Sequence, residues 1–388
     1  MSSAPDHHVE SEHRVTVLEL FFDLVFVFAI TQVTSFLAHE PTAGGLGRGM
    51  LLAAALWWAW VAYAWLTNTL GASATAARVT VLLAMAAMLV ASLAVPEAFG
   101  DHAVIFAVSY AVVRVLHVLL YYLATRGQDG IRGAVVRLAP PLLVGSALLI
   151  AASFASGPAR LALWCVGLAI DYAGPVLAGS RGWRVHANHF VERHGLIIII
   201  ALGEAIVSIG VGAAGLDLEA DVLSAALLAM TVAGALWWAY FDSVSLAAEH
   251  TLARTEGDAQ AALARDAYSY LHMPMVAGII LVALGLKKSL AHPGDALAVV
   301  PSLALYGGAA IYYAAHVAFR RRILGTWSGA RALAVVVLSA ATFVGPRVPA
   351  LTSLALVAAL CVALVVWETA VYRRWLATRA GPRSRKPA

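Results

Sequence analysis

The sequence predicts an all-α, polytopic helical membrane protein with about twelve transmembrane helices in two parallel six-helix repeats. Of its 388 residues, 61% are hydrophobic and only 12% are charged. A soluble globular domain carries about 25% charged residues. Apolar runs long enough to cross a bilayer recur along the whole chain. The composition therefore excludes an ordinary soluble domain, and the formal net charge of +4 reflects loop charges rather than nucleic-acid binding.

Each expected membrane segment is an apolar run bounded by charged, glycine or proline residues. In chain order the segments are 15–38, 47–69, 76–95, 101–124, 134–154, 158–179, 191–213, 221–245, 264–286, 297–320, 330–346 and 349–376. Pro346 and Pro349 predict a tight turn after the short eleventh segment. The expected repeats cover 15–180 and 191–376. The other parts are a polar N-terminus (1–14), a linker (181–190) and a basic tail (377–388).

Lysine and arginine are distributed unevenly between the loops on the two sides. On this assignment 20 fall on the side of the termini and 5 on the opposite side. Cytoplasmic loops of membrane proteins carry the excess of these residues. We therefore expect a multi-pass protein of the cytoplasmic (inner) membrane with both termini in the cytoplasm. Its basic tail is expected to meet anionic lipid headgroups, so membrane lipids are expected partners.

Short matches between the halves indicate an internal repeat. Trp57-Trp58-Ala59-Trp60 in the second segment matches Trp237-Trp238-Ala239-Tyr240 in the eighth. The pairs His117-Val118 and His316-Val317, and Cys165-Val166 and Cys361-Val362, keep the same helix order. Six helices per repeat is an even number, so both repeats would enter the membrane from the same side. They would then be related by an axis along the membrane normal.

The first segment contains two carboxylates in an otherwise apolar run. Glu19 and Asp23 are four residues apart and share one face of a helix. An acidic side chain at the centre of a membrane helix costs about 2.5–3.5 kcal/mol, and such groups usually face a bundle interior or a water-filled cavity. Two interpretations stay open: structural carboxylates that tie helices together, or carriers of protons or cations.

The fourth segment contains a polar stripe. Tyr110, Arg114, His117 and Tyr121 follow spacings of 4, 3 and 4 residues, so they share a helix face. Arginine does not lose its proton in proteins, so Arg114 needs an anionic partner: Asp23, Asp171, Glu204 or a bound anion. A clamp between helices and a substrate or proton site are both compatible with this pattern. The tenth segment offers a counterpart stripe in Tyr306, Tyr313, His316 and Arg320.

The seventh segment contains the acidic residue that we most expect to be functional. Glu192 lies at its cytoplasmic mouth, and Glu204 follows 12 residues later, or about 18 Å along a helix. Gln32 occupies the corresponding place in the first repeat. Gly203 and Gly210 share a face and are expected to permit close helix approach.

The remaining polar residues form no strong metal-binding or catalytic motif. His272 precedes Pro274, where the ninth segment is expected to kink. His186, His189 and His194 do not match the spacing of a strong metal-binding motif, so no metal or cofactor is expected. The chain also lacks the phosphate-binding loop of ATP-driven pumps and the common hydrolase and metalloprotease motifs. The full set of candidate site residues is Glu19, Asp23, Gln32, Arg114, His117, Asp171, Glu192, Glu204, His272 and His316.

Two stretches resemble a known family. Residues 19–32, Glu-Leu-Phe-Phe-Asp-Leu-Val-Phe-Val-Phe-Ala-Ile-Thr-Gln, resemble the opening signature of the bacterial low temperature requirement A proteins. Residues 192–196, Glu-Arg-His-Gly-Leu, followed by Leu-Gly-Glu at 202–204, resemble the second signature, with His194 at a position where an aromatic residue is expected. The resemblance implies a multi-pass membrane protein named for a growth phenotype in the cold. It supplies no catalytic residues.

We interpret the sequence as a carrier that moves a small solute or ion with proton coupling. Glu19, Asp23 and Glu204 would carry protons or cations, and Arg114 would act as a counter-ion or anion anchor. His117 and His316 would act as titrating gates. One alternative is a channel, because the Phe-Phe-Asp motif resembles the Phe-Ser-Asp motif of lysosomal potassium/proton channels, with Phe22 in place of serine. Another is an intramembrane enzyme or sensor. A pocket open to one side would favour a carrier, and a continuous polar pore a channel.

Overall fold

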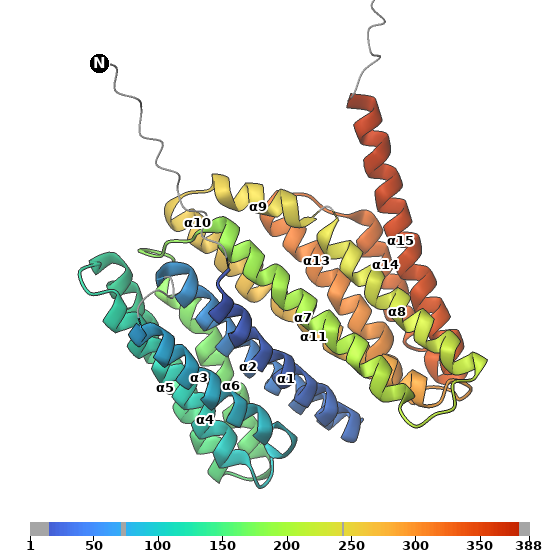
Figure 1. Ribbon diagram of the computed structural model, residues 1–388, viewed down its shortest axis with the longest axis horizontal. Helices are drawn as coiled ribbons and strands as arrows, with labels where there is room; N and C mark the ends of the chain where they lie inside the picture. The colour runs from blue at the N-terminus through green and yellow to red at the C-terminus, as the bar shows by residue number, and fades with distance from the viewer. Residues whose placement is uncertain (1–14, 71–74, 243, 380–388) are drawn as a thin grey trace, which may run out of the picture.

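A computed structural model describes residues 15–70, 75–242 and 244–379 (Figure 1). The expected polar N-terminus 1–14 and most of the basic tail lie outside the described residues. The first-half helices are α1 Val17–His39, α2 Ala43–Leu70, α3 Thr75–Ala94, η1 Val95–Glu97, α4 Ala103–Ala124, α5 Asp129–Phe154 and α6 Gly157–Ala178. The second-half helices are α7 Ala187–Ala213, α8 Ala220–Phe241, α9 Val244–Arg254, α10 Gly257–Ala264, η2 Arg265–Tyr270, α11 His272–Ala291, α12 Val299–Ser302, η3 Leu303–Gly307, α13 Gly308–Leu324, α14 Gly329–Ala341, η4 Gly345–Arg347 and α15 Ala350–Arg379.

The helices have the lengths and composition of membrane spans. Within the described residues, eleven helical stretches are long and apolar enough to cross a bilayer. The expected tenth segment is not among them, but it forms a continuous helical run of α12, η3 and α13 that buries Tyr312, Tyr313 and His316. The chain is therefore an all-α polytopic membrane protein. Helix α1 begins and α15 ends on the same side of the bundle, as an even number of crossings requires (Figure 1).

The connection between the eighth and ninth expected segments is helical, which the sequence pattern did not predict. Helix α9 crosses the end of the bundle on the side where α1 begins (Figure 1). Helix α10 then continues through the π-helical turn η2 into α11. An α-helix would use the N–H at position 274 to bond the carbonyl of Tyr270, and Pro274 has none. A wide π-helical turn therefore lies just before the proline, and the expected kink stays a prediction.

The two halves pack in a similar order. Helix α1 packs against α2 and α3 in the first half, and α7 packs against α8 and α11 in the second. Likewise α4 contacts α5 and α5 contacts α6, while α13 contacts α14 and α14 contacts α15. Helices α1 and α7 contact each other at the junction between the halves. Both halves thus pack their helices in the same order, and the expected two parallel repeats stay a prediction.

Close helix approach occurs at other glycines than expected. The prediction for Gly203 and Gly210 is wrong, because a Cβ added at either would meet no atom within 4 Å. The close approach joins α11 to α13 instead. A Cβ on Gly278 would lie 2.6 Å from the carbonyl oxygen of Gly308, and one on Gly308 would lie 2.8 Å from the carbonyl oxygen of Gly278. Only glycine lets these two backbones touch.

We expect Gly278→Val to destabilise the fold by about 1–3 kcal/mol, because the added methyl groups force two packed backbones apart. The control Gly210→Ala has open space for its methyl group and should stabilise the helix by about 0.5–1 kcal/mol. Thermal unfolding of both variants in detergent measures the difference. A wild-type midpoint for Gly278→Val would contradict the close approach of α11 and α13.

Candidate functional site

One group of ionisable side chains lies where the first turns of α1 face α7 and α2. We call Glu19, Asp23, Trp60, His189 and Arg193 the acidic cluster; all five are at most 4% exposed. The guanidinium of Arg193 lies 3.0 Å from both oxygens of Asp23 and 4.0 Å from Glu19. The indole of Trp60 donates to Asp23 at 2.9 Å. Both carboxylates predicted in the first segment therefore meet a buried arginine.

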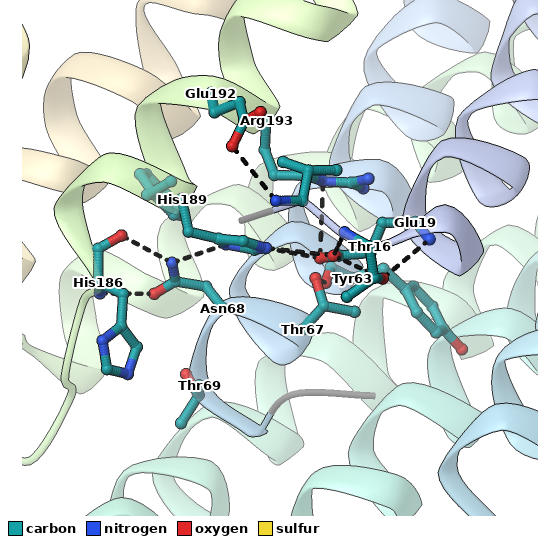
Figure 2. Close-up of polar contacts among 12 residues, drawn as sticks. Thr16, Glu19, Tyr63, Thr67, Asn68, Thr69, His186, His189, Glu192 and Arg193 are labelled. Atoms are coloured by element: carbon teal, nitrogen blue, oxygen red, sulfur yellow. Dashed lines mark hydrogen bonds and ion pairs between the residues drawn. The ribbon is translucent and has the colours of Figure 1, made fainter. Parts of the chain in front are cut away.

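His189, on α7, is the fifth member of this cluster (Figure 2). Its Nε2 lies 3.0 Å from Glu19, and its Nδ1 lies 3.0 Å from the amide nitrogen of Asn68 on α2. Because the Asn68 amide donates to Nδ1, Nε2 carries the proton that points at Glu19. Glu19 also accepts a 2.8 Å hydrogen bond from the backbone N–H of Thr16, which caps α1. The Glu19 carboxylate is thus held by its own helix and by α7.

Glu192 does not belong to the acidic cluster. Its side chain is exposed, and one oxygen accepts a 3.2 Å hydrogen bond from the backbone of Val15. Arg193, counted among the basic residues on the side of the termini, is fully buried in α7, which begins at Ala187 rather than at 191. Its guanidinium faces Asp23 of α1.

Arg114 pairs with Asp171, one of its three predicted partners. Its Nη2 donates to the Asp171 carboxylate at 2.6 Å, and its Nη1 donates to the carbonyl of Trp58 at 3.2 Å. The Trp58 indole and the Tyr110 hydroxyl also donate to Asp171, at 3.2 and 3.3 Å. Arg114 and Asp171 are each 2% exposed. This arrangement joins α2, α4 and α6 and corresponds to the predicted clamp between helices.

The second half contains a similar arginine clamp that the sequence interpretation missed. Arg331, counted among the basic residues on the side of the termini, is 1% exposed and binds both oxygens of Glu368 at 2.8 and 2.9 Å. It also donates to the carbonyl of Ala239 on α8 and to Nδ1 of His316, at 3.0 and 2.8 Å. The spacing of the Cys-Val pairs places Asp171 one residue from the position of Glu368. In each half an arginine thus links the last helix to the helix with the paired tryptophans.

Glu204 lies apart from both clamps. Its Oε2 accepts a hydrogen bond of 2.5 Å from the hydroxyl of Thr31 on α1, and its Oε1 accepts one of 3.1 Å from Ser208. It is 3% exposed. Among the described residues, no basic group forms an ion pair with it within 4.0 Å. Gln32, the predicted counterpart, is half-buried beside Thr31, and Thr31 makes the contact instead.

The predicted site residues therefore do not converge on one cavity. Asp23 and Thr31 are eight residues apart on α1, about 12 Å along the helix axis. A small cavity of about 20 Å³ lies along this stretch, and its walls are apolar, including Phe26, Ile30 and Ile197. The acidic cluster and Glu204 thus lie on one interface between α1 and α7, separated by apolar side chains. The Arg114 clamp lies between other helices.

The buried histidines fall into separate surroundings. The Nε2 atom of His272 shares a 2.9 Å hydrogen bond with the Tyr240 hydroxyl, and its Nδ1 lies 3.0 Å from the carbonyl of Ala267 in η2. Its ring lies 5.2 Å from that of His194. His117 lies one turn from Arg114 and packs against Tyr63 and Tyr121. Within the described residues, no three histidine, cysteine or carboxylate side chains are placed to hold a metal ion.

Comparisons with known proteins agree with this architecture. No solved structure matches the chain. An uncharacterized protein of Rhizobium meliloti (strain 1021) is 29% identical over 367 residues, which cover 90% of this chain and 88% of that protein. The family model described as bacterial low temperature requirement A protein (LtrA) matches residues 14–366, nearly the whole chain. The chain therefore belongs to the bacterial low temperature requirement A family of membrane proteins.

Proposed function

We propose that the protein moves a small solute or ion across the cytoplasmic membrane and couples this movement to protons carried along the interface of α1 and α7. The termini would lie in the cytoplasm, as the loop charges predict. Carrier activity remains the favoured interpretation, with a channel as the alternative. The observation that carries the proposal is Glu204, a buried acid whose described hydrogen-bond partners are the hydroxyls of Thr31 and Ser208.

Glu204 has no ion-pair partner within 4.0 Å among the described residues, and the positive charge of Lys287 acts on it from farther away. A buried carboxyl group without an ion pair is costly when ionised and can hold a proton instead. Asp23 and Arg114 differ from Glu204, because each has an oppositely charged partner within 3.0 Å. Ionisable residues inside membrane segments mark ion paths and proton relays in pumps and transporters. Glu204 is therefore the buried acid that can take up a proton without breaking an ion pair.

The apolar stretch between Asp23 and Thr31 supports a carrier. A water molecule needs about 10–15 Å³ of cavity volume, so the cavity of about 20 Å³ beside Phe26 and Ile30 has room for one water and no continuous file. Protons could cross this stretch only after it opens. A protein that opens one side at a time has this property, whereas an open channel has a continuous polar path.

We expect Glu204→Gln to abolish proton-linked flux and leave the fold intact, because glutamine keeps the shape, accepts one of the two hydroxyl hydrogen bonds through its carbonyl oxygen and donates to the other hydroxyl through its amide nitrogen. The purified protein is reconstituted into liposomes that enclose a pH-sensitive dye. A potassium-diffusion potential across the membrane drives protons inward, and the dye reports acidification of the lumen. Thr31→Val should lower the rate as well, because it removes the shortest hydrogen bond to Glu204.

The matched control is Glu219→Gln, which makes the same chemical change at an exposed glutamate before α8. Liposomes with this variant should acidify at the wild-type rate. Normal flux from a folded Glu204→Gln protein would exclude Glu204 as the proton carrier. Discrete current steps from the wild-type protein in a planar bilayer would favour the channel alternative over the carrier.

A further inference from the structure

Asn68, near the end of α2, connects the two halves of the chain through one buried amide group. Its Oδ1 accepts a 3.0 Å hydrogen bond from the backbone N–H of His186, and its Nδ2 donates to the carbonyl of the same residue at 2.9 Å. Nδ2 also lies 3.0 Å from Nδ1 of His189 (Figure 2). Asn68 is 1% exposed and His189 is 4% exposed. One side chain of the first half therefore holds both the residue before α7 and the first turn of α7.

These contacts allow the Asn68 amide only one orientation. A backbone N–H can only donate, so the atom that faces the N–H of His186 must be the Asn68 oxygen. The Asn68 nitrogen then donates one hydrogen to the His186 carbonyl and the other to Nδ1 of His189. Turning the amide over, so that its oxygen faced His189, would break both backbone hydrogen bonds. His189 is therefore held in its neutral form, with Nδ1 as the acceptor.

The charges on the other side of the His189 ring favour its protonated form. The charged and titratable groups around it come from α1 and α7, with one more from α11 behind them: Glu19, Asp23, Arg193, His194 and His272. With both acids ionised and His189 neutral, the acidic cluster contains two carboxylates and one guanidinium. A buried charge without a counter-charge is costly. Protonation of His189 supplies a second cation, 3.0 Å from Glu19.

The two sides of His189 thus have opposite requirements. Glu19 accepts a hydrogen bond from Nε2–H in either form of the ring, and a stronger one from an imidazolium. Asn68 requires an unprotonated Nδ1, because an imidazolium would point a second N–H at the N–H of the amide. Uptake of a proton by His189 must therefore break its contact with Asn68 while it strengthens its contact with Glu19.

We propose that Asn68 and His189 form a proton-operated latch between α2 and α7. The latch is closed while His189 is neutral, and it opens when His189 takes up a proton and releases the Asn68 amide. It lies at the end of the bundle where α1 begins, so its release would let the start of α7 move away from α2 and admit water to Glu19. The latch would regulate access to the proton path along α1 and α7, and this role rests on the proposed function.

The pH dependence of the latch has a definite sign. The open latch binds one proton more than the closed latch, so lowering the pH favours the open form. For a single proton, the ratio of open to closed forms rises by at most about tenfold for each unit that the pH falls. Histidine is the side chain whose charge ordinarily changes between about pH 5 and 8, so the experiment covers this range.

Two measurements on the full-length protein in detergent test the latch. Nitrogen-15 spectra of histidine-labelled protein distinguish protonated from unprotonated ring nitrogens, and comparison with His189→Gln identifies the His189 signals among the 13 histidines. At about pH 8 the ring should be neutral and protonated at Nε2. Hydrogen exchange of the His186 backbone amide, relative to its intrinsic rate at each pH, reports the closed latch. Its protection should fall about tenfold or more over two pH units as His189 becomes an imidazolium.

Variants of the two residues separate the latch from general effects of acid. Asn68→Leu removes the amide, so His186 should be unprotected at every pH. Asn68→Asp offers an oxygen to Nδ1–H, and His189 should take up its proton at a pH at least about one unit higher than in the wild type. Asn188→Leu, at an exposed position beside His189, is the matched control and should behave like the wild type. If the Asn68 variants do not fold, His189→Gln gives the test, because His186 protection should then not change with pH.

Several results would overturn the latch. They are a neutral wild-type His189 that is protonated at Nδ1, a His189 that stays neutral down to about pH 5, or equal His186 protection with neutral and protonated His189. Protection that still falls at low pH in His189→Gln would overturn it as well. Glu204→Gln should leave both measurements unchanged, so failure of the proton path and failure of the latch are separate outcomes.

Discussion

Replacing Arg114 by leucine is expected to remove most of the folded protein. The substitution leaves the Asp171 carboxylate buried at 2% exposure with no cation beside it. Removing one partner of a buried ion pair costs roughly 3–5 kcal/mol, a large part of the 5–15 kcal/mol that stabilises a typical protein. The measurement is the yield of monodisperse protein in detergent, followed by its thermal unfolding midpoint.

A second change distinguishes this interpretation from a general effect of losing arginine. The double variant Arg114→Leu with Asp171→Leu should recover part of the stability, because apolar residues often replace a buried ion pair without loss. Recovery is partial because Trp58 and Tyr110 lose their acceptor. The control is Arg48→Leu, whose partner Glu40 is 43% exposed; such surface pairs contribute about 0–1 kcal/mol. Equal losses for Arg48→Leu and Arg114→Leu would contradict the clamp.

The second large effect is expected for Arg193→Leu. Arg193 is fully buried, lies 3.0 Å from Asp23, and has its guanidinium 5.5 Å from the ring of Trp60. Its loss leaves Asp23 and Glu19 as two buried carboxylates with His189 as the nearest basic group. We expect a destabilisation of about 3–5 kcal/mol. The measurement is again folded yield and thermal unfolding in detergent.

Neutralising the partner tests the pairing. Arg193→Leu combined with Asp23→Asn should fold better than Arg193→Leu alone, because asparagine keeps the acceptor for Trp60 and removes the unpaired charge. Arg193→Lys should be more stable than Arg193→Leu but less stable than its retained charge suggests, because lysine lacks the planar fork that reaches both oxygens of Asp23. Arg184→Leu, at an exposed position before α7, should match the wild type. A fully stable Arg193→Leu protein would show that Asp23 does not depend on this pair.

The membrane class and the helical segments could be predicted because they depend on local properties. Apolar length sets a membrane span, and the helical period places Tyr110, Arg114 and His117 on one buried face. The prediction that Arg114 pairs with one of three acids is confirmed, because an arginine that keeps its charge must meet an anion inside a bilayer.

Other parts of the site depend on helix boundaries and on rotation of helices about their own axes. Arg193 and Arg331 lie near the starts of their expected segments, 191–213 and 330–346, and were counted with the basic residues on the side of the termini. Arg193 lies on a buried face of α7, which begins about one turn earlier than expected, and Arg331 lies on a buried face of α14. A shift of one residue rotates a side chain by about 100°, which decides whether an arginine faces water or a carboxylate. Capping signals before Ala187 were too weak to reveal the longer helix.

The sequence by itself determined that the chain crosses the membrane many times and carries acids and arginines that need partners within it. Only the tertiary structure decided which partners meet: Asp171 for Arg114, Asp23 for Arg193, Glu368 for Arg331, and the hydroxyls of Thr31 and Ser208 for Glu204. The partners of the first two pairs are 57 and 170 residues apart. A helical pattern specifies the face on which a residue lies but not the helix opposite that face, because that choice is made by the packing of the whole bundle.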